Sequence, residues 1–81
     1  MLESKKFKVL SHLKKQKSIT PVDAYKLYGT MRLGAIIHRL REEYEIATHI
    51  IDDADRFGNP VRYAKYVYKR PIQKTQHQVN L

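Results

Sequence analysis

The stretch that decides the fold runs from Thr20 to Tyr44 and reads TPVDAYKLYGTMRLGAIIHRLREEY. Its first four residues supply an N-cap threonine, a proline at the first helical position and an acid three residues after the cap. Gly29 can adopt the left-handed conformation that ends a helix, so we predict a helix from Pro21 to Tyr28. Because Asp23 is shorter than the usual glutamate, we expect the reciprocal cap to form only in part.

A longer helix is predicted directly after the glycine, with Thr30 as its cap and its end near Tyr44. At 100° per residue, its apolar side chains fall within one sector, and small, polar and cationic residues occupy the opposite side. The apolar sector contains Leu33, Ile36, Ile37, Leu40 and Tyr44, and the opposite side carries Met31, Arg32, Ala35, His38, Arg39 and Glu42. One side therefore suits a core and the other a ligand. Gly34 is small, which suits close approach to a groove or close packing against the preceding helix.

On the N-terminal side, an amphipathic helix is predicted after Ser4, with Phe7, Leu10 and Leu13 as its apolar stripe. The pair Ser18-Ile19 forms a short extended link. The apolar stretch of the second helix comes from Val22, Ala24, Tyr25, Leu27 and Tyr28.

On the C-terminal side, Ile46–Ile51 and Val61–Tyr68 are predicted as two strands, and the turn-forming residues 52–60 connect them as a hairpin. Lys65 must face water, so Ala64, Tyr66 and Tyr68 are placed inward. We expect one domain over residues 1–68 and a basic, disordered tail over residues 69–81.

The chain is small and strongly basic. Its 81 residues include 16 Lys and Arg against eight Asp and Glu, a formal net charge of +8, which favours a polyanionic partner. The charge is uneven, because basic segments at both ends flank the stretch 45–60, which holds four acids and one arginine.

Several function classes lack support in the sequence. The chain has no cysteine, and its longest apolar run is Ala35-Ile36-Ile37, too short for a transmembrane helix, so no membrane partner is expected. Its four histidines lack the spacing of metal ligands, and no phosphate-binding loop or nucleophile motif occurs. We therefore predict neither an enzyme nor a bound cofactor or metal.

The order of helix, short helix, glycine turn, longer helix and β-hairpin is that of an α+β winged helix-turn-helix domain. A helix with a narrow exposed strip fits the major groove of B-DNA, where base edges differ in their donors and acceptors. The preceding helix braces it, and the hairpin, or wing, reaches an adjacent phosphate or the minor groove. We therefore predict binding of double-stranded DNA through helix 30–44.

Three segments carry a resemblance to a known family. They are Ile19-Thr20-Pro21 through Gly29, Met31 through Arg41, and Arg56-Phe57-Gly58-Asn59-Pro60 through Tyr66. Together they resemble a family of short winged-helix proteins of bacteriophages and prophages. The resemblance implies a three-helix core with a two- or three-stranded sheet and DNA binding, and it says more about fold than about role. We predict a phage or prophage transcriptional regulator or accessory factor of DNA transactions, in the cytoplasm of a bacterial host. The acids Asp52, Asp53 and Asp55 depart from the pattern and put phosphate contact by the wing in doubt.

The candidate DNA-binding residues lie on three elements, and all but two are on the reading helix and the wing. They are Thr30, Met31, Arg32, Ala35, His38 and Arg39 on the reading helix, Arg56 and Arg62 on the wing, and Lys5 and Lys6 on the first helix. Each has a plainer alternative. Thr30 can act as a cap only, and His38 can be an exposed bystander. Arg39 can pair with Glu42, and the wing arginines can pair with Asp53 and Asp55.

The sequence is compatible with several partners in addition to duplex DNA or in place of it. One short reading helix gives limited specificity, so a homodimer or cooperative assembly on DNA is plausible. The main alternative is a phage-encoded module that binds or inhibits a host protein. A weaker one is single-strand or RNA binding, for which only Tyr63 looks free to stack, since the tyrosines at positions 25, 28, 44, 66 and 68 have core-like spacing.

Overall fold

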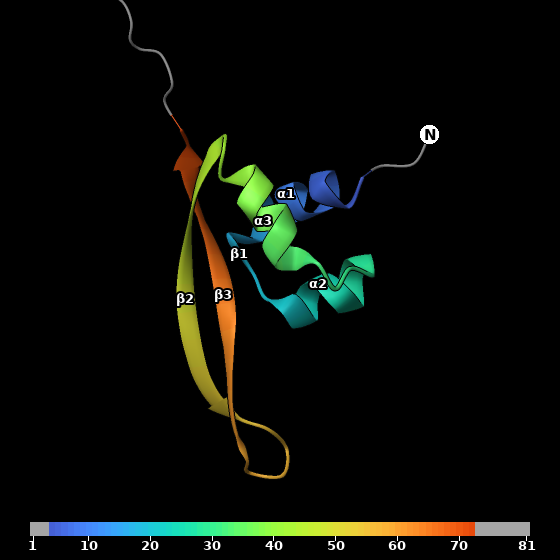
Figure 1. Cartoon of the computed structure of the whole chain (residues 1–81), viewed down its shortest axis with the longest axis vertical. Helices are drawn as coiled ribbons and strands as arrows, with labels where there is room; N and C mark the ends of the chain where they lie inside the picture. The colour runs from blue at the N-terminus through green and yellow to red at the C-terminus, as the bar shows by residue number, and fades with distance from the viewer. Residues whose placement is uncertain (1–3, 73–81) are drawn as a thin grey trace, which may run out of the picture.

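The computed structural model describes residues 4–72, in which three helices pack on one side of a three-stranded antiparallel sheet (Figure 1). The strand order is β1-β3-β2, so β3 is the central strand. The elements in chain order are α1 (Lys5–Gln16), β1 (Ser18–Ile19), α2 (Pro21–Tyr28), α3 (Leu33–Leu40), β2 (Tyr44–Ala54) and β3 (Pro60–Pro71). The predicted α+β order of helices followed by a hairpin is confirmed.

Helix α1 begins as predicted, and its inward-facing stripe differs from the predicted one at one position. The hydroxyl of Ser4 caps it by accepting the N–H of Phe7 at 3.2 Å. Val9 and Leu13, one turn apart, are fully buried, whereas Phe7 is 55% exposed. The expected stripe was therefore wrong at its first position, and Phe7 borders a shallow depression beside Leu10 instead.

Helix α2 has the predicted bounds and a complete reciprocal cap. The N–H of Asp23 donates to the hydroxyl of Thr20 at 3.2 Å, and the N–H of Thr20 donates to the Asp23 carboxylate at 3.1 Å. An aspartate therefore suffices for the full capping box, contrary to the sequence-based expectation. Gly29 ends the helix with φ +68°, as predicted.

The apolar surface expected of α2 is mostly on the outside. Only Ala24 is buried, while Val22, Tyr25 and Leu27 are 56–60% exposed. The core-like spacing assigned to Tyr25 was therefore wrong. Tyr28 does face inward, and its hydroxyl lies 2.8 Å from Nδ1 of His12, which ties α2 to α1.

Helix α3 is shorter than predicted at both ends. It begins at Leu33 and ends at Leu40, after which residues 41–43 form a turn and Tyr44 starts β2. Arg41 stabilises this change of direction, because its Nε donates to the carbonyl of Ile46 at 3.0 Å and its Nη2 to the hydroxyl of Thr48. Tyr44 is half-buried, as its place in the apolar sector suggested, but as a strand residue.

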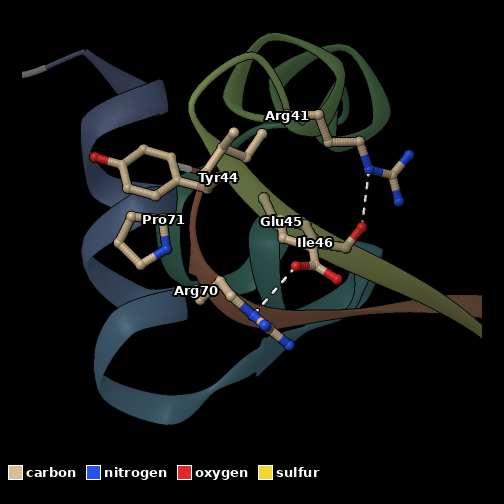
Figure 2. A pocket seen from close by; sticks show the side chains of 7 residues that line it. Arg41, Tyr44, Glu45, Ile46, Arg70 and Pro71 are labelled. Carbon is tan, nitrogen blue, oxygen red and sulfur yellow. Dashed lines mark hydrogen bonds and ion pairs between the residues drawn. The ribbon is translucent and has the colours of Figure 1, made fainter. Parts of the chain in front are cut away.

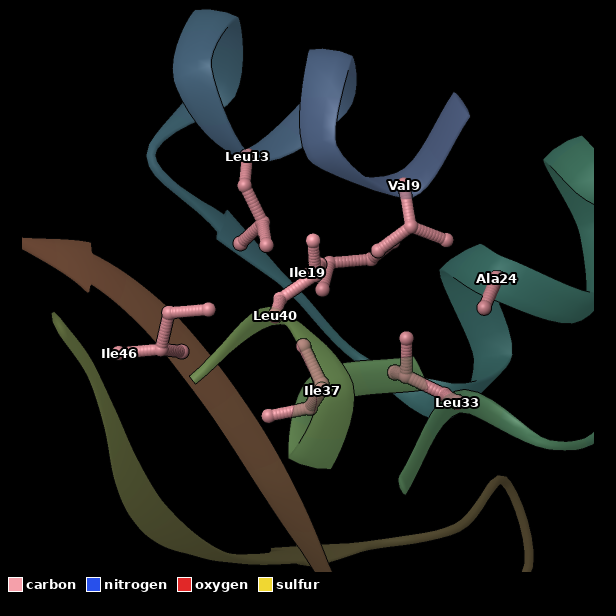
Figure 3. Packing of buried hydrophobic residues seen from close by; sticks show 8 residues of the cluster. All are labelled: Val9, Leu13, Ile19, Ala24, Leu33, Ile37, Leu40 and Ile46. Atoms are coloured by element: carbon pink, nitrogen blue, oxygen red, sulfur yellow. The ribbon is translucent and has the colours of Figure 1, made fainter. Parts of the chain in front are cut away.

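The core lies between the helices and the base of the sheet (Figure 3). Helices α1, α2 and α3, strand β1 and strand β2 each contribute at least one buried side chain. The full set is Val9, Leu13, Ile19, Ala24, Leu33, Ile37, Leu40 and Ile46. The half-buried Tyr66 and Tyr68 pack against this cluster from β3, as predicted.

The hairpin is longer than predicted. Strands β2 and β3 pair from Tyr44↔Pro71 to Ala54↔Pro60, with a register shift between Glu45 and Ile46. The return strand was expected to end at Tyr68 but continues to Pro71, and Ile72 N–H then donates to the Glu43 carbonyl at 2.9 Å. The first residues of the expected tail are thus part of the sheet, and residues 73–81 lie outside the described residues.

We predict that shortening one core side chain destabilises the domain while the same change on the hairpin does not. Ile37 is 1% exposed and Ile50 is 57% exposed. Ile37→Val removes one buried methyl group and should cost about 0.5–1.5 kcal/mol in the free energy of unfolding. Ile50→Val should change it by less than about 0.5 kcal/mol, as urea titration can measure. Equal losses in the two variants would contradict this core.

Candidate nucleic-acid interface

The side of α3 turned away from the core is exposed, as predicted. Gly34, Ala35, His38 and Arg39 lie on it, and we call these four residues the reading face. They share one side because residues spaced by one, four and five positions fall close together on a helix. Two further candidates precede the helix, since Arg32 is its exposed N-cap residue and Met31 is 85% exposed in the turn before it.

Thr30 does not lie on this surface. Its side chain is only 6% exposed, and its hydroxyl accepts the N–H of Arg32 at 3.1 Å. The prediction that Thr30 caps α3 was therefore wrong, because the N-cap is Arg32 and no side chain caps that end. A buried and engaged hydroxyl cannot reach a ligand, so Thr30 holds the turn instead.

The absence of a side-chain cap leaves the first turn of α3 accessible. The first N–H groups of a helix have no partner within the helix, and phosphate oxygens readily accept them. Gly34 adds no side chain to this turn. A Cβ placed on Gly34 would meet only the Tyr66 hydroxyl, at 3.9 Å, an ordinary contact with β3. Close packing against α2, the alternative reason for a small residue here, is thus not observed.

The cations at the reading face have no acidic partner. Within residues 4–72 the ion pairs are Arg62–Asp52 and Arg70–Glu45, so neither Arg32 nor Arg39 takes part in one. The alternative in which Arg39 pairs with Glu42 is not formed. Both guanidinium groups remain available for phosphate oxygens or for the O6 and N7 acceptors of guanine.

The two wing arginines differ. Arg62 Nε lies 2.7 Å from Asp52 Oδ1, and both side chains are largely exposed. Pairing inside the hairpin was one of the two alternatives for Arg62, but its partner is Asp52, directly opposite in the register, and not Asp53 or Asp55. Arg56 lies in the turn at the tip and belongs to no ion pair within the described chain.

The lysines of α1 are not gathered with the reading face. Lys5 Nζ donates to the carbonyl of Gly29 at 3.1 Å, at the C-terminal end of α2, where a cation suits the helix dipole. Lys6 borders a depression with Leu40 and Glu43, at the C-terminal end of α3 and thus at the other end from Arg32. Lys5 therefore lies by Gly29, three residues before Arg32, whereas Lys6 lies by the other end of α3.

Asp55 organises the wing tip. Its carboxylate accepts the N–H groups of Phe57 and Asn59, each at 2.9 Å, while Gly58 takes φ +85°. The hydrogen bond from the backbone of Asn59 is the largest influence and lowers the pKa of Asp55 below its ordinary value, against an opposing effect of desolvation that is larger than the contribution of the Phe57 N–H. This acid therefore builds the turn, a role that the turn-forming composition of 52–60 could have suggested.

A shallow depression at the base of the hairpin is a weaker candidate (Figure 2). Arg41 and Arg70 border it, and Tyr44 and Pro71 also line it. Both guanidinium groups are engaged, because Arg41 Nε donates to the carbonyl of Ile46 and Arg70 Nε pairs with Glu45 at 3.2 Å. These cations brace the hairpin against the end of α3, so they do not form an open anion site.

Other site types find no support in the described part of the chain. Residues 4–72 contain no group of three or more acidic or histidine side chains that could hold a metal ion. None of their helices has the length and apolar character needed to cross a membrane. Tyr63, expected to be free for stacking, is half-buried opposite Ile51.

Comparison with known proteins gives one result. A family model described as a winged helix-turn-helix domain matches residues 4–71, which includes every element of the fold. No curated protein and no solved structure matches the chain.

We predict that Asp55 titrates below its ordinary pKa of 3.8. Because the folded pKa is lowered, the ionised carboxylate stabilises the tip at higher pH, and this contribution is lost as the pH falls through the lowered pKa. In an NMR titration, the amide signals of Phe57 and Asn59 should shift with the midpoint of the Asp55 carboxyl. In Asp55→Asn those shifts should disappear. A midpoint at or above 3.8 would contradict the geometry of the turn.

Proposed function

Since this chain belongs to the winged helix-turn-helix domain family, we propose that it binds double-stranded DNA and reads the major groove with α3. The observation that carries the proposal is the reading face, where Ala35, His38 and Arg39 stand exposed while the opposite side of the same helix is buried. A major groove about 12 Å wide admits one helix, and short side chains allow its backbone to come close.

The residues of this surface divide into two kinds of contact. Arg32 and Arg39 can each offer a guanidinium fork to a guanine, and Met31 and Ala35 can meet a thymine methyl group. His38 can donate to a base or a phosphate. The uncapped first turn of α3 can hold a phosphate with its backbone N–H groups, which would fix the helix in the groove without selecting a sequence.

The biological role that fits these features is that of a phage or prophage transcriptional regulator, or of an accessory factor in DNA transactions, in a bacterial host. Helix α3 has only eight residues and reads few base pairs. Specific binding therefore calls for a homodimer or for cooperative assembly on repeated sites. The net charge of +8 adds attraction to any duplex.

We predict a steep dependence of duplex affinity on salt. If about five or six phosphates are neutralised, the plot of log affinity against log salt should have a slope of roughly −4 to −6. Fluorescence anisotropy with a duplex selected from a random pool measures it. A flat response would contradict DNA binding.

Three single substitutions distinguish sequence-specific contacts with bases from sequence-independent electrostatic attraction to the duplex. Arg32→Ala and Arg39→Ala should each lower the preference for the selected duplex over random DNA by about 1–3 kcal/mol. Arg70→Ala is the matched control, because it removes the same charge at the base of the hairpin. It should weaken binding to both duplexes equally. Equal losses on both duplexes in Arg32→Ala would make Arg32 a backbone contact.

A second candidate function, a module that binds a host protein, is favoured by one observation. Four exposed residues of α2 and the following turn, Pro21, Val22, Tyr25 and Met31, surround a shallow apolar depression. Exposed apolar clusters on small proteins often mark interaction sites. If this surface binds a protein, capture of that partner from nuclease-treated lysate should be lost in Tyr25→Glu and kept in Arg39→Ala.

A further inference from the structure

The tip of the wing carries an aromatic side chain with nothing to cover it. Phe57 is 80% exposed, and among the large apolar residues of the described chain only Met31 is more exposed. Burying a phenylalanine side chain is favourable, so one this exposed at the end of a hairpin is a strong candidate for a contact. The folded domain makes no use of this side chain in its core.

The turn that presents Phe57 is held in one conformation. The carboxylate of Asp55 accepts both the Phe57 and the Asn59 N–H, and the Asp55 N–H donates to the Asn59 carbonyl at 2.9 Å. A further bond joins the Gly58 N–H to the Asp55 carbonyl at 3.0 Å. Because the turn is already ordered, placing Phe57 against a partner costs little conformational entropy.

The acids of the wing do not oppose an anionic partner as strongly as their number suggests. Asp52 is matched by Arg62 across the strands, so its charge is offset within the hairpin. Asp53 and Asp55 keep their charges, but both carboxylates accept backbone N–H groups of their own segment, that of Ala54 and those of Phe57 and Asn59. Arg56, next to Phe57, has no acidic partner within residues 4–72. The apex therefore presents one guanidinium group and one aromatic ring side by side in the sequence.

The length of the hairpin suits a groove adjacent to the one that α3 would occupy. Tyr66 lies beside Gly34 of the reading face, six residue steps along β3 from Pro60, the first residue after the turn. At ~3.3 Å per residue the hairpin extends about 20 Å beyond α3. Half a turn of B-DNA, the step from a major to a minor groove, is about 17 Å. Figure 1 shows the hairpin running well past the helical layer.

We propose that Phe57 enters the minor groove next to the site read by α3 and wedges between two base pairs, so that binding kinks the duplex. Apolar wedges of this kind partly unstack a base step, which costs free energy, and bend DNA toward the major groove. Arg56 holds the tip in the negative potential of the same groove. The cost is lowest at flexible pyrimidine–purine steps, so a TA or CA step is expected at a fixed distance from the bases read by α3.

This inference rests on the proposed function, and the test separates the two. A duplex that contains the selected site carries a fluorophore at each end, and 2-aminopurine replaces a purine at successive steps beside the site. Saturating wild-type protein should shorten the end-to-end distance, corresponding to a bend of roughly 20–90°. It should also raise the 2-aminopurine fluorescence at one step only, where stacking is lost.

Variants at the tip give the decisive comparison. Phe57→Ala should still saturate the duplex but reduce the bend below about 20° and abolish the fluorescence rise, whereas Phe57→Leu, which keeps an apolar wedge, should retain most of both. Ile50→Ala removes another exposed apolar side chain of the hairpin and should change neither signal. Arg32→Ala should need more protein to saturate but then bend the duplex as the wild type does.

The outcomes that overturn the inference are distinct. If the wild type saturates the duplex without a bend, or if Phe57→Ala bends it equally, Phe57 is not a wedge, while the proposed function stands. If the wild type binds no duplex, both fail. If Phe57→Ala leaves the duplex signals intact but abolishes capture of a host protein from nuclease-treated lysate, the tip serves a protein partner and the wedge is excluded.

Discussion

The burial of one stripe of α3 is the constraint on which the rest of the structure depends. Leu33, Ile37 and Leu40 are at most 3% exposed and pack with side chains from α1 and β1. Because these three positions occupy one side of a short helix, their burial turns Gly34, Ala35, His38 and Arg39 outward. The reading face is therefore a consequence of core packing, and a change that lets α3 rotate would remove the core and the interface together.

The same core also sets where the wing stands. Strand β3 is held between β1 and β2, with Ile19 paired to Tyr66, and Tyr66 lies next to Gly34 of α3. The distance from the reading helix to the tip is thus fixed by strand register. A slip by one residue would turn every side chain of β3 to the other face and withdraw Tyr66 from the core, so the register is strongly specified.

Much of this fold could be predicted from local chemistry. The caps at Ser4, Thr20 and Gly29 act within a few residues of themselves, so the sequence reveals them and the structure confirms them. The end of α3 could not be predicted in the same way. It is set by the pairing of Tyr44 with Pro71, which joins distant parts of the chain, together with the bonds from Arg41 to Ile46 and Thr48 of β2.

The helical periodicity wrongly placed Tyr44 in the helix that precedes it, and there is a physical reason for this. Tyr44 is half-buried in a strand, and the helical pattern had also predicted that it is buried. Burial of this residue therefore does not distinguish a helix from a strand. In the candidate site, too, some features follow from the local sequence pattern and others only from contacts between distant segments. Which side of α3 is exposed follows from its pattern, but the partner of Arg62 follows from register, and the exposed apolar side of α2 follows from how few neighbours that helix has.

The acidic wing shows why counting charges along a chain is a poor guide to the field that a partner meets. Four acids against one arginine between residues 45 and 60 suggest repulsion of DNA. In the fold, however, Asp52 and Glu45 are matched by arginines of β3, which lies outside that stretch, and Asp55 is bonded to its own turn. The acids thus brace the hairpin and shape its tip. Beside Asp53, which is in no ion pair within residues 4–72, the tip presents Arg56 and Phe57. A cation and an aromatic ring on a rigid support are suited to a groove that the acid count alone would exclude.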